Sequence, residues 1–537
     1  MRSRNGYSAV PRLIMGIVGV SALLAVSQLH VAVAQPAANT QLSLQDALHF
    51  ALRQNPNTLL QQQQVTASRG LLLQAQSQFD PVASAASTRT RDIRTLRQDE
   101  ITALQAAGIF SVAQQTTDAT THRVGVDKTL VNGIAVGTGF SVTAVDDSSA
   151  RQAGIPIQTS GRLNFSLKVP LLKNSGTETV GAQVAASDAE LAASLLDLLH
   201  TNSQAVLNTT IAYWDVVARR SRLAIAATAE KRAIELVDEM RKLIAADQLP
   251  AAEIELVVAS RAEKTAARVA AEQALLDAQH ALARQLGFSS AQMSVLPVPG
   301  DRLPNYDGRK INVTDQVERL IRSAIATRAD LDANRKRELA SQYRLAAARN
   351  NLKPHLDFNL NLSYAGLAEG APVSAFDRAY YTGRVGPSVT SSLSLQWPFA
   401  NSFARGNLLA QSAVHDADLI RLHDLEAGVA SNVAAVAAAL QRSVEQLVEG
   451  REAVKRYAVT LQNQLTKRRL GSATLLDVLN VEDRLNNALL NEVQLQQGYA
   501  NAIVQLRFEL GYLVHKRDDS YDIHIADLLM PEFLPRE

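Results

Sequence analysis

The sequence predicts a mainly helical protein in which a β-strand region is inserted into each of two similar halves. Long Ala-rich stretches carry apolar residues at three- and four-residue spacing, which is the pattern of packed, coiled-coil-like helices. Two stretches, 163–172 and 393–406, alternate apolar and polar residues up to a proline and then become helical. Alternation predicts a strand with one apolar and one polar face, and proline cannot donate to the strand ladder. Because this order occurs twice, we expect two internal repeats.

The composition fits close helix packing better than a bulky globular core. Of the 537 residues, 47% are hydrophobic but only 5% are aromatic, and small residues, mainly alanine, make up the difference. The sequence contains no cysteine, which excludes disulfides, thiolate metal sites and cysteine nucleophiles.

Residues 1–34 are expected to be a cleaved signal peptide. A start with three arginines precedes the apolar run Leu13–Val26, and Ala32-Val33-Ala34 is a small-residue cleavage site. A membrane anchor is the alternative, but the apolar run is shorter than the ~20 residues of a spanning helix. Without the signal peptide, 51 basic residues face 52 acidic residues, a net charge of −1 instead of +2. The composition therefore indicates no nucleic-acid partner.

The first half is expected to begin with helices and to continue into strands. Ser43 is the expected N-cap of the first helix, which meets Asn55-Pro56 and is followed by a Gln-rich helical stretch. Residues 82–170 alternate in several places and predict strands with polar insertions. Within them, Asn132-Gly133 is a hairpin turn signal between two alternating runs.

Long helices complete the first half, and the second half repeats the order. The helical pattern extends from about Thr177 to Leu286 with one break near 245–252. In the second half, a helix over 311–352 precedes strands over about 355–397, and helices follow with one break at 469–474.

The two halves align at fixed intervals. At the start of the strand region the matched positions Pro81 and Pro354 are 273 residues apart, and at its end Pro170 and Pro398 are 228 residues apart. The strand region of the first half is therefore 45 residues longer. Insertions collect in exposed loops, so we expect the tips of the strands to face open solvent. The expected divisions are a signal peptide (1–34), a first repeat (35–288), a linker (289–310), a second repeat (311–513) and a C-terminal tail (514–537).

The strands also predict how this chain would enter a membrane. After the signal peptide, no stretch of the sequence reaches ~18 consecutive apolar residues, so a spanning part would consist of strands closed into a barrel. Each half offers two strong strands, and the first half adds one or two more. Four strands cannot close a barrel, so several chains would have to do so together. An ordinary half-buried sheet is the alternative.

Five segments in a fixed order carry a family resemblance. They are Leu42–Leu48 with Asn55-Pro56, Pro170–Gly176, Ala212-Tyr213-Trp214, Pro398–Gly406 and Arg469–Leu479. With these segments, the chain resembles the TolC-like outer membrane efflux protein family over about Leu42 to Leu513.

The resemblance implies a homotrimer with a trimeric α-barrel of long helices in the periplasm and a 12-stranded β-barrel in the lipid of the outer membrane. The helical tips would dock a periplasmic adaptor protein bound to an inner membrane pump. The expected function is the gated exit duct of a tripartite efflux or type I secretion system, located in the outer membrane and extending into the periplasm. We expect no cofactor, no metal and no enzymatic activity, because the sequence has no nucleophile–base set, phosphate loop or dinucleotide motif. The alternative from another class is a non-conducting periplasmic coiled-coil scaffold protein.

Two carboxylates are the candidates for a gate at the helical tips. Glu253 and Asp477 occupy aligned positions after the two breaks, and the family carries acidic residues just after the second tip, which favours Asp477. Trimer symmetry would make each carboxylate a ring that favours cations. Both residues are also first-turn acids that a helix N-terminus favours, and the two roles are compatible.

The tips are also the expected docking site for the adaptor. Gly471 matches the tip glycine of the family and would make a tight turn next to Ser472, and Asp247 and Pro250 lie at the first tip. Lys467-Arg468-Arg469 forms a basic cluster that would pair with an adaptor, pair with acids of a neighbouring helix, or lie on a solvated helix face.

Aromatic residues mark two further places. Trp397, Phe399 and Tyr364 are expected at the membrane–water boundary as an aromatic girdle, or else in the packing of the strand-to-helix bend. Tyr213 and Trp214 are expected to fill a helix interface.

Overall fold

The structure is a computed structural model that describes residues 41–106, 108, 114–247, 254–294, 297–306, 316–381, 385–517 and 520–523. These residues belong to one compact unit that begins at Gln41. The expected signal peptide and the tip residues Pro250 and Glu253 lie outside the described residues.

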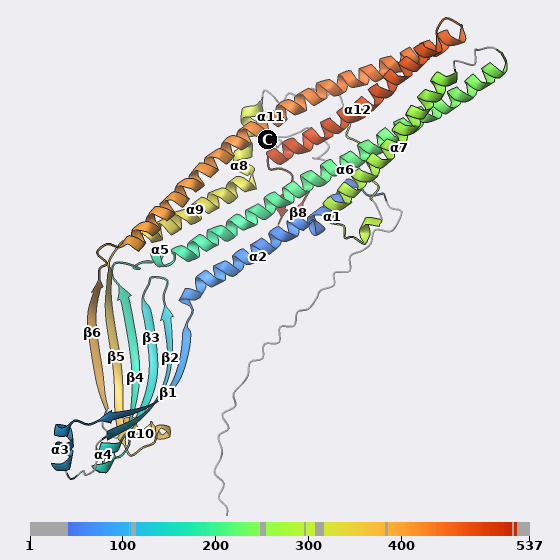
Figure 1. Cartoon of the computed structure of the whole chain (residues 1–537). Coiled ribbons are helices and arrows are strands. Elements are labelled where there is room, and N and C mark those ends of the chain that lie inside the picture. The colour runs from blue at the N-terminus through green and yellow to red at the C-terminus, as the bar shows by residue number, and fades with distance from the viewer. Residues whose placement is uncertain are drawn as a thin grey trace, which may run out of the picture. The chain divides into compact units, whose positions relative to one another are not determined.

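Helices dominate the described chain (Figure 1), as the sequence predicts. No helix among the described residues is both long and apolar enough to cross a membrane. The helices are α1 (Leu44–Gln54), α2 (Pro56–Gln76), α3 (Gln98–Ala106), α4 (Ser148–Gln152), α5 (Thr177–Val180), α6 (Ala182–Ala245), α7 (Ile254–Gln285), α8 (Val317–Thr327), α9 (Ala329–Asn350), α10 (Arg378–Tyr381), α11 (Ser402–Arg469) and α12 (Leu475–Glu509).

Local signals fix where several helices begin and end. The Oγ atom of Ser43 accepts a hydrogen bond from the Asp46 N–H (3.1 Å), which confirms the predicted N-cap of α1. Asn55 caps α2 by accepting from the Asn57 N–H (2.9 Å), and Pro56 occupies the first helical position, where its missing N–H costs nothing. The two predicted breaks are confirmed, because α6 ends at Ala245 and α11 ends at Arg469.

The prediction of one helix over 311–352 is wrong, because the described part of this stretch breaks at Arg328. Arg328 has extended backbone (φ −71°, ψ 124°) between α8 and α9, although neither proline nor glycine stands there. Its side chain is buried in ion pairs with Asp330 and Glu509. The break is thus held by a long-range contact that local sequence patterns do not reveal.

Four helices form a single layer. The helices α2, α6, α9 and α11 lie side by side in that order, each in contact with the next (Figure 1). Small residues allow this close approach, since Ala186, Ala189 and Ala340 are buried between α6 and α9. Tyr213 and Trp214 of α6 are 0% and 1% exposed within a larger apolar core, which confirms that they fill a helix interface.

The strands form one antiparallel sheet whose spatial order follows the sequence from β1 to β6. The predicted hairpin turn is confirmed, because Gly133 lies between β2 and β3 with φ +90°. The strands are β1 (Val82–Thr95), β2 (Gln114–Thr129), β3 (Ala135–Asp147), β4 (Gln158–Pro170), β5 (His355–Glu369) and β6 (Val385–Gln396), and β7 (His515–Arg517) and β8 (Ser520–Asp522) pair separately.

The number of strands differs from the one that the family resemblance implied. A trimeric 12-stranded barrel needs four strands from each chain, whereas the sheet has six. Two strands belong to the second half and four to the first. The hairpin β2–β3 and its connection to β4 account for the extra length of the first strand region.

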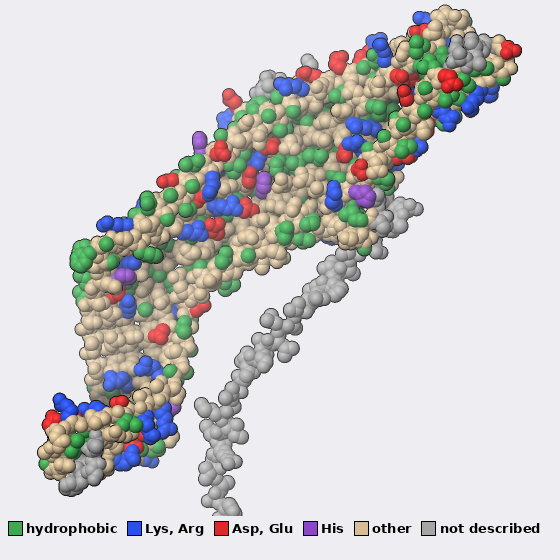
Figure 2. Space-filling model, viewed as in Figure 1, with side chains coloured by type: hydrophobic (Ala, Val, Ile, Leu, Met, Phe, Trp, Pro, Cys, Tyr) green, Lys and Arg blue, Asp and Glu red, His purple; other side chains and the backbone are tan. Residues whose placement is uncertain are grey.

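Alternation gives the sheet one apolar and one polar face from β2 to β6, whereas β1 carries mainly small and hydroxyl side chains on both faces. On one face, Val124, Phe140 and Leu163 lie opposite one another on successive strands, and Leu163 lies opposite Tyr364. The other face carries Gly, Ser and Asn in the neighbouring row, such as Asn164. Figure 2 shows one side of the sheet as mostly uncharged, with charged side chains gathered near the loop end.

Candidate functional site: the helical tips

The second tip joins α11 to α12 by a tight turn. The Gly471 N–H donates to the Arg468 carbonyl (2.9 Å) and the Ser472 N–H to the Lys467 carbonyl (2.9 Å). Gly471 has φ +74°, a left-handed conformation that glycine adopts without strain and that commonly ends a helix. The structure therefore places Gly471 and Ser472 in the tight turn that the sequence predicts.

Asp477 begins α12 as part of a reciprocal cap. Its carboxylate accepts hydrogen bonds from the N–H (2.9 Å) and the hydroxyl (2.7 Å) of Thr474, and its own N–H donates to the Thr474 Oγ1 (3.2 Å). The hydrogen bonds from the Thr474 side chain and backbone hold the pKa of Asp477 below its ordinary value. The side chain is exposed, so this carboxylate is both a helix-start acid and an ionised group open to solvent.

The first tip uses a different residue for the same turn. Asp247 follows the end of α6 in a left-handed conformation (φ 50°), and its N–H donates to the Ile244 carbonyl (3.0 Å). It stands 224 residues before Gly471, and the same interval separates Gly287 from Gly511 at the ends of the following long helices. Aspartate is among the few residues that adopt this conformation readily, so α6 and α11 each end in a left-handed residue although the side chains differ.

The two tips pack against each other. Val237 and Met240 of α6, Val257 of α7 and Leu475 of α12 form one apolar cluster. Arg468 lies beside it, 3.5 Å from the Glu239 carboxylate. Of the roles considered for the basic cluster, Arg468 thus pairs with an acid of a neighbouring helix.

Ion pairs between the helices continue from the tips along α6, α7 and α12. Arg232 of α6 contacts Glu482 (3.3 Å) and Asn486 (3.1 Å) of α12, and Lys264 of α7 contacts Asp483. Burial raises the pKa of Glu482, and the charges of Arg232 and Lys264 oppose that shift. These residues were not predicted from the sequence, where the adjacent acids Glu482 and Asp483 in α12 were the visible signal.

Met240→Ala is expected to loosen the tips without disturbing the sheet. Met240 is fully buried, and its truncation should cost about 2–3 kcal/mol of local stability through lost contacts and a cavity. Amide hydrogen exchange should then become faster at the C-terminal end of α6 and at the N-terminal end of α12. Leu470→Ala is the matched control, because Leu470 lies at the same tip but is 78% exposed. Equal exchange in both variants would show that this cluster does not hold the tips.

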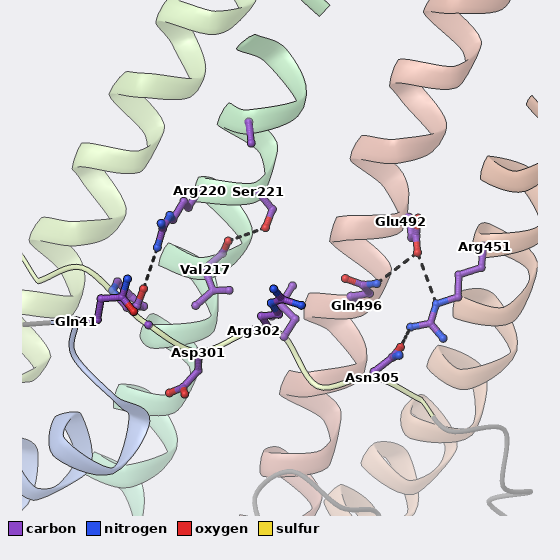
Figure 3. Close-up of a pocket in the computed structure, with 14 residues that line it drawn as sticks. Gln41, Val217, Arg220, Ser221, Asp301, Arg302, Asn305, Arg451, Glu492 and Gln496 are labelled. Carbon is purple, nitrogen blue, oxygen red and sulfur yellow. Dashed lines mark hydrogen bonds and ion pairs between the residues drawn. The ribbon is translucent and has the colours of Figure 1, made fainter. Parts of the chain in front are cut away.

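A polar groove of about 880 Å³ lies where the segment after α7 crosses between α6 and α12 (Figure 3). Arg220 of α6 donates to the Pro299 carbonyl (3.1 Å). Arg451 of α11 lies 3.5 Å from Glu492 of α12 and also contacts Asn305. These contacts tie the connecting segment to α6 and α11 and tie α11 to α12, which gives the polar residues of the groove a structural role. Among the described residues, no group of three or more His, Cys, Asp or Glu side chains is placed to hold a metal ion.

The three boundary aromatics lie at two separate levels along the sheet. Trp397 and Phe399 follow β6 at the helix end and are 64% and 96% exposed. Tyr364 lies nine residues from His355, the residue of β5 that pairs with the last residue of β6. There it stacks on Tyr380 of α10, with ring centroids 6.0 Å apart. The aromatics thus lie at two levels of the sheet, with Tyr364 five residues before the end of β5, instead of forming one cluster.

Comparison with known proteins identifies the part of the chain that carries the second tip. Residues 320–512 match the sequence profile of the family described as outer membrane efflux protein. Residues 320–512 therefore carry an outer membrane efflux protein domain. The TolC-like family expected from the sequence motifs is thereby confirmed for this part of the chain. The outer membrane efflux protein domain includes Gly471 and Asp477, whereas Asp247 lies before it.

Solved structures extend the likeness of fold to most of the chain. The outer-membrane channel OprN is 16% identical, with a TM-score of 0.63 over 87% of this chain and 89% of OprN. VceC of Vibrio cholerae, an outer membrane protein, is 16% identical, with a TM-score of 0.62 over 87% of this chain and 96% of VceC. The CmeC outer membrane channel of Campylobacter jejuni is 13% identical, with a TM-score of 0.62 over 89% of this chain and 90% of CmeC. No curated protein was found to match the chain.

Proposed function

We propose that the protein is the outer membrane exit duct of a tripartite efflux or type I secretion system. The observation that carries this proposal is the direct continuity between a two-faced sheet and a layer of long polar helices. The apolar face of the sheet is open to solvent in a single chain, with Leu163 51% and Val389 69% exposed. Contact with lipid would cover that face, while the helices extend into the periplasm.

Three copies would assemble around one duct, each built from two repeats. The repeats find support in the helix bounds, since α1 and α8 have 11 residues each and stand 273 residues apart. Gly287 and Gly511 end the corresponding long helices with φ +77° and +76°. A cleaved signal peptide at residues 1–34 would direct the chain out of the cytoplasm.

The aromatics would mark the two surfaces of the membrane. The nine residues between the levels of Trp397 and Tyr364 span about 30 Å along a strand, or about 23 Å across a bilayer at a tilt of roughly 40°. Outer membrane barrels carry an apolar band of about 25 Å between aromatic girdles. Trp397 and Phe399 would lie at the periplasmic surface and Tyr364 at the outer surface.

The tips would be both gate and docking site. The exposed Asp477 carboxylate, repeated by the three copies, would form a ring that favours cations, with Glu253 as its counterpart at the first tip. Gly471, Ser472, Asp247 and Pro250 would contact the periplasmic adaptor, which would link the duct to an inner membrane pump.

Fractionation tests the proposed function. We expect the protein in the outer membrane, as a trimer that stays intact in SDS at room temperature and dissociates on boiling. Recovery from the soluble periplasm without such a trimer would overturn the duct and favour a coiled-coil scaffold.

A further inference from the structure

The hairpin β2–β3 is part of the wall formed by the other strands. β2 pairs with β1 from Val82 to Thr95, and β3 pairs with β4 over most of its length. The turn between β2 and β3 reaches the strand-to-helix junction, where the Asn132 carbonyl accepts from the Gly176 N–H (3.2 Å). Gly133 leaves no room for a side chain, since an added Cβ would lie 2.2 Å from the Asn174 carbonyl oxygen. The hairpin is therefore paired on both sides and packed against the strand-to-helix junction, as the neighbouring strands are.

The sheet ends in two long open edges. Within the described residues, β1 pairs only with β2 and β6 only with β5, and the side chains of β1 are exposed along its whole length. Unpaired backbone groups in lipid cost several kcal/mol each, so both edges need partners. Six strands are too few to close on themselves, because the smallest membrane barrels have eight. β1 and β6 run in opposite directions, so the β6 edge of one copy fits the β1 edge of another as an antiparallel pair.

The width of the helical layer agrees with six strands from each chain. The layer α2, α6, α9 and α11 leads into or out of β1, β4, β5 and β6. Four helices at 8–10 Å spacing occupy roughly 32–40 Å. Six strands about 4.8 Å apart and tilted by about 45° occupy roughly 40 Å, whereas four would occupy only about 27 Å. A ring of helices from several chains and a ring of their six-stranded sheets would thus have similar circumferences.

We propose that three copies of the chain close a single barrel of 18 strands, in which β6 of each copy pairs with β1 of the next. The number follows from three sheets of six strands, and it rests on the trimeric duct proposed above. Barrels of 16–18 strands leave an open aqueous channel. The outer part of this duct would therefore be as wide as a porin, and restriction of flow would fall to the helical tips.

Cysteine cross-linking across the seam tests the proposal. The chain has no native cysteine, so introduced pairs are the only thiols. Val389→Cys in β6 would be combined with one cysteine in β1, scanned because barrels stagger their strands. A second series would pair Val389→Cys with cysteines in β3, the edge strand if β1–β2 lay outside a 12-stranded barrel. All positions share the apolar face with Val389: Ala83, Ala85, Ser87, Arg89 and Ile93 in β1, and Val136, Thr138, Phe140 and Val142 in β3.

The gel after oxidation separates the outcomes. Covalent dimers and trimers with one register of the β1 series are the expected result, and Ser388→Cys, on the opposite face, should give none with the same partners. Cross-links with the β3 series would overturn the 18-stranded barrel and leave the trimeric duct intact. A heat-sensitive trimer without cross-links in either series would also overturn the seam. Absence of any trimer would overturn both the seam and the duct.

Discussion

Arg328→Met is expected to lower the free energy of unfolding by about 3–5 kcal/mol, because it leaves a buried carboxylate without its partner. The side chains of Arg328 and Glu509 are only 8% and 7% exposed, and their nearest atoms are 2.5 Å apart. Arg328 also holds Asp330 at 2.7 Å and lies over the ring of Phe508. Methionine keeps much of the volume, so the loss would report the ion pairs.

The same cluster predicts how stability depends on pH. Burial alone would raise the pKa of Asp330, but hydrogen bonds and charge attraction from Arg328 outweigh it and lower that pKa below 3.8. A lowered carboxyl pKa stabilises the fold above its ordinary value, and that stability is lost as pH falls below about 4. Burial, helped by the charge of Arg328, lowers the pKa of His200 below 6.5 against the pull of Asp330, Asp197 and Glu509. The unfolded chain therefore binds a proton at His200 more readily than the folded chain does, and the folded state loses stability as pH falls below about 6.5.

Denaturant unfolding of the detergent-solubilised protein at pH 8 would measure the Arg328 effect. Arg335→Met is the matched control, since Arg335 is 38% exposed in its pairs with Asp332 and Glu426 and should cost at most about 1 kcal/mol. Adding Glu509→Gln to Arg328→Met should recover part of the loss by removing the stranded charge. If Arg328→Met costs no more than Arg335→Met, the cluster does not hold the break between α8 and α9.

Arg328 also shows where sequence patterns stop being informative. Proline, glycine and capping residues mark the ends of α1, α2 and α11 locally, so those boundaries could be predicted. The break at Arg328 depends on Glu509, a residue 181 positions away, and no local pattern records such a contact.

The four strands per chain implied by the family resemblance fell short of the six observed for a related reason, although the sequence itself allowed one or two further strands in the first half. In β1 both faces carry small or hydroxyl side chains, such as Ala83, Ser84 and Ala85, so the alternation that marks β5 is weak there. What identifies β1 as a strand is its pairing with β2 along its whole length, which depends on the chain returning through a hairpin. The 45-residue excess of the first half indicated an insertion, but only the pairing shows that it extends the sheet.

At the tips, the sequence predicted the tight turn at Gly471 and the place of Asp477 in the first turn of α12, but not the contacts between hairpins. It did not predict the left-handed conformation of Asp247 or the reciprocal cap between Thr474 and Asp477. The pairing of Arg468 with Glu239 and of Arg232 with Glu482 joins helices from opposite halves. Charge patterns along one helix could not assign those partners.

Asp477→Asn is expected to abolish most of the cation preference of the channel and to weaken block by divalent cations by about tenfold. Asparagine keeps an oxygen that can accept from Thr474, so the cap at the start of α12 survives while the charge is lost. The pKa of Asp477 lies below its ordinary value, so the wild-type preference should persist from pH 8 to pH 5. Reversal potentials and divalent block in planar bilayers would measure both effects.

Thr474→Ala is the matched variant that separates the two roles of Asp477. It removes the hydroxyl that donates to the carboxylate and accepts from the Asp477 N–H, but it leaves the charge in place. A gate role predicts that Asp477→Asn changes selectivity and Thr474→Ala does not. If both variants conduct like the wild type, Asp477 is only a helix-start acid. If Thr474→Ala alone alters the channel, the shape of the tip matters more than its charge.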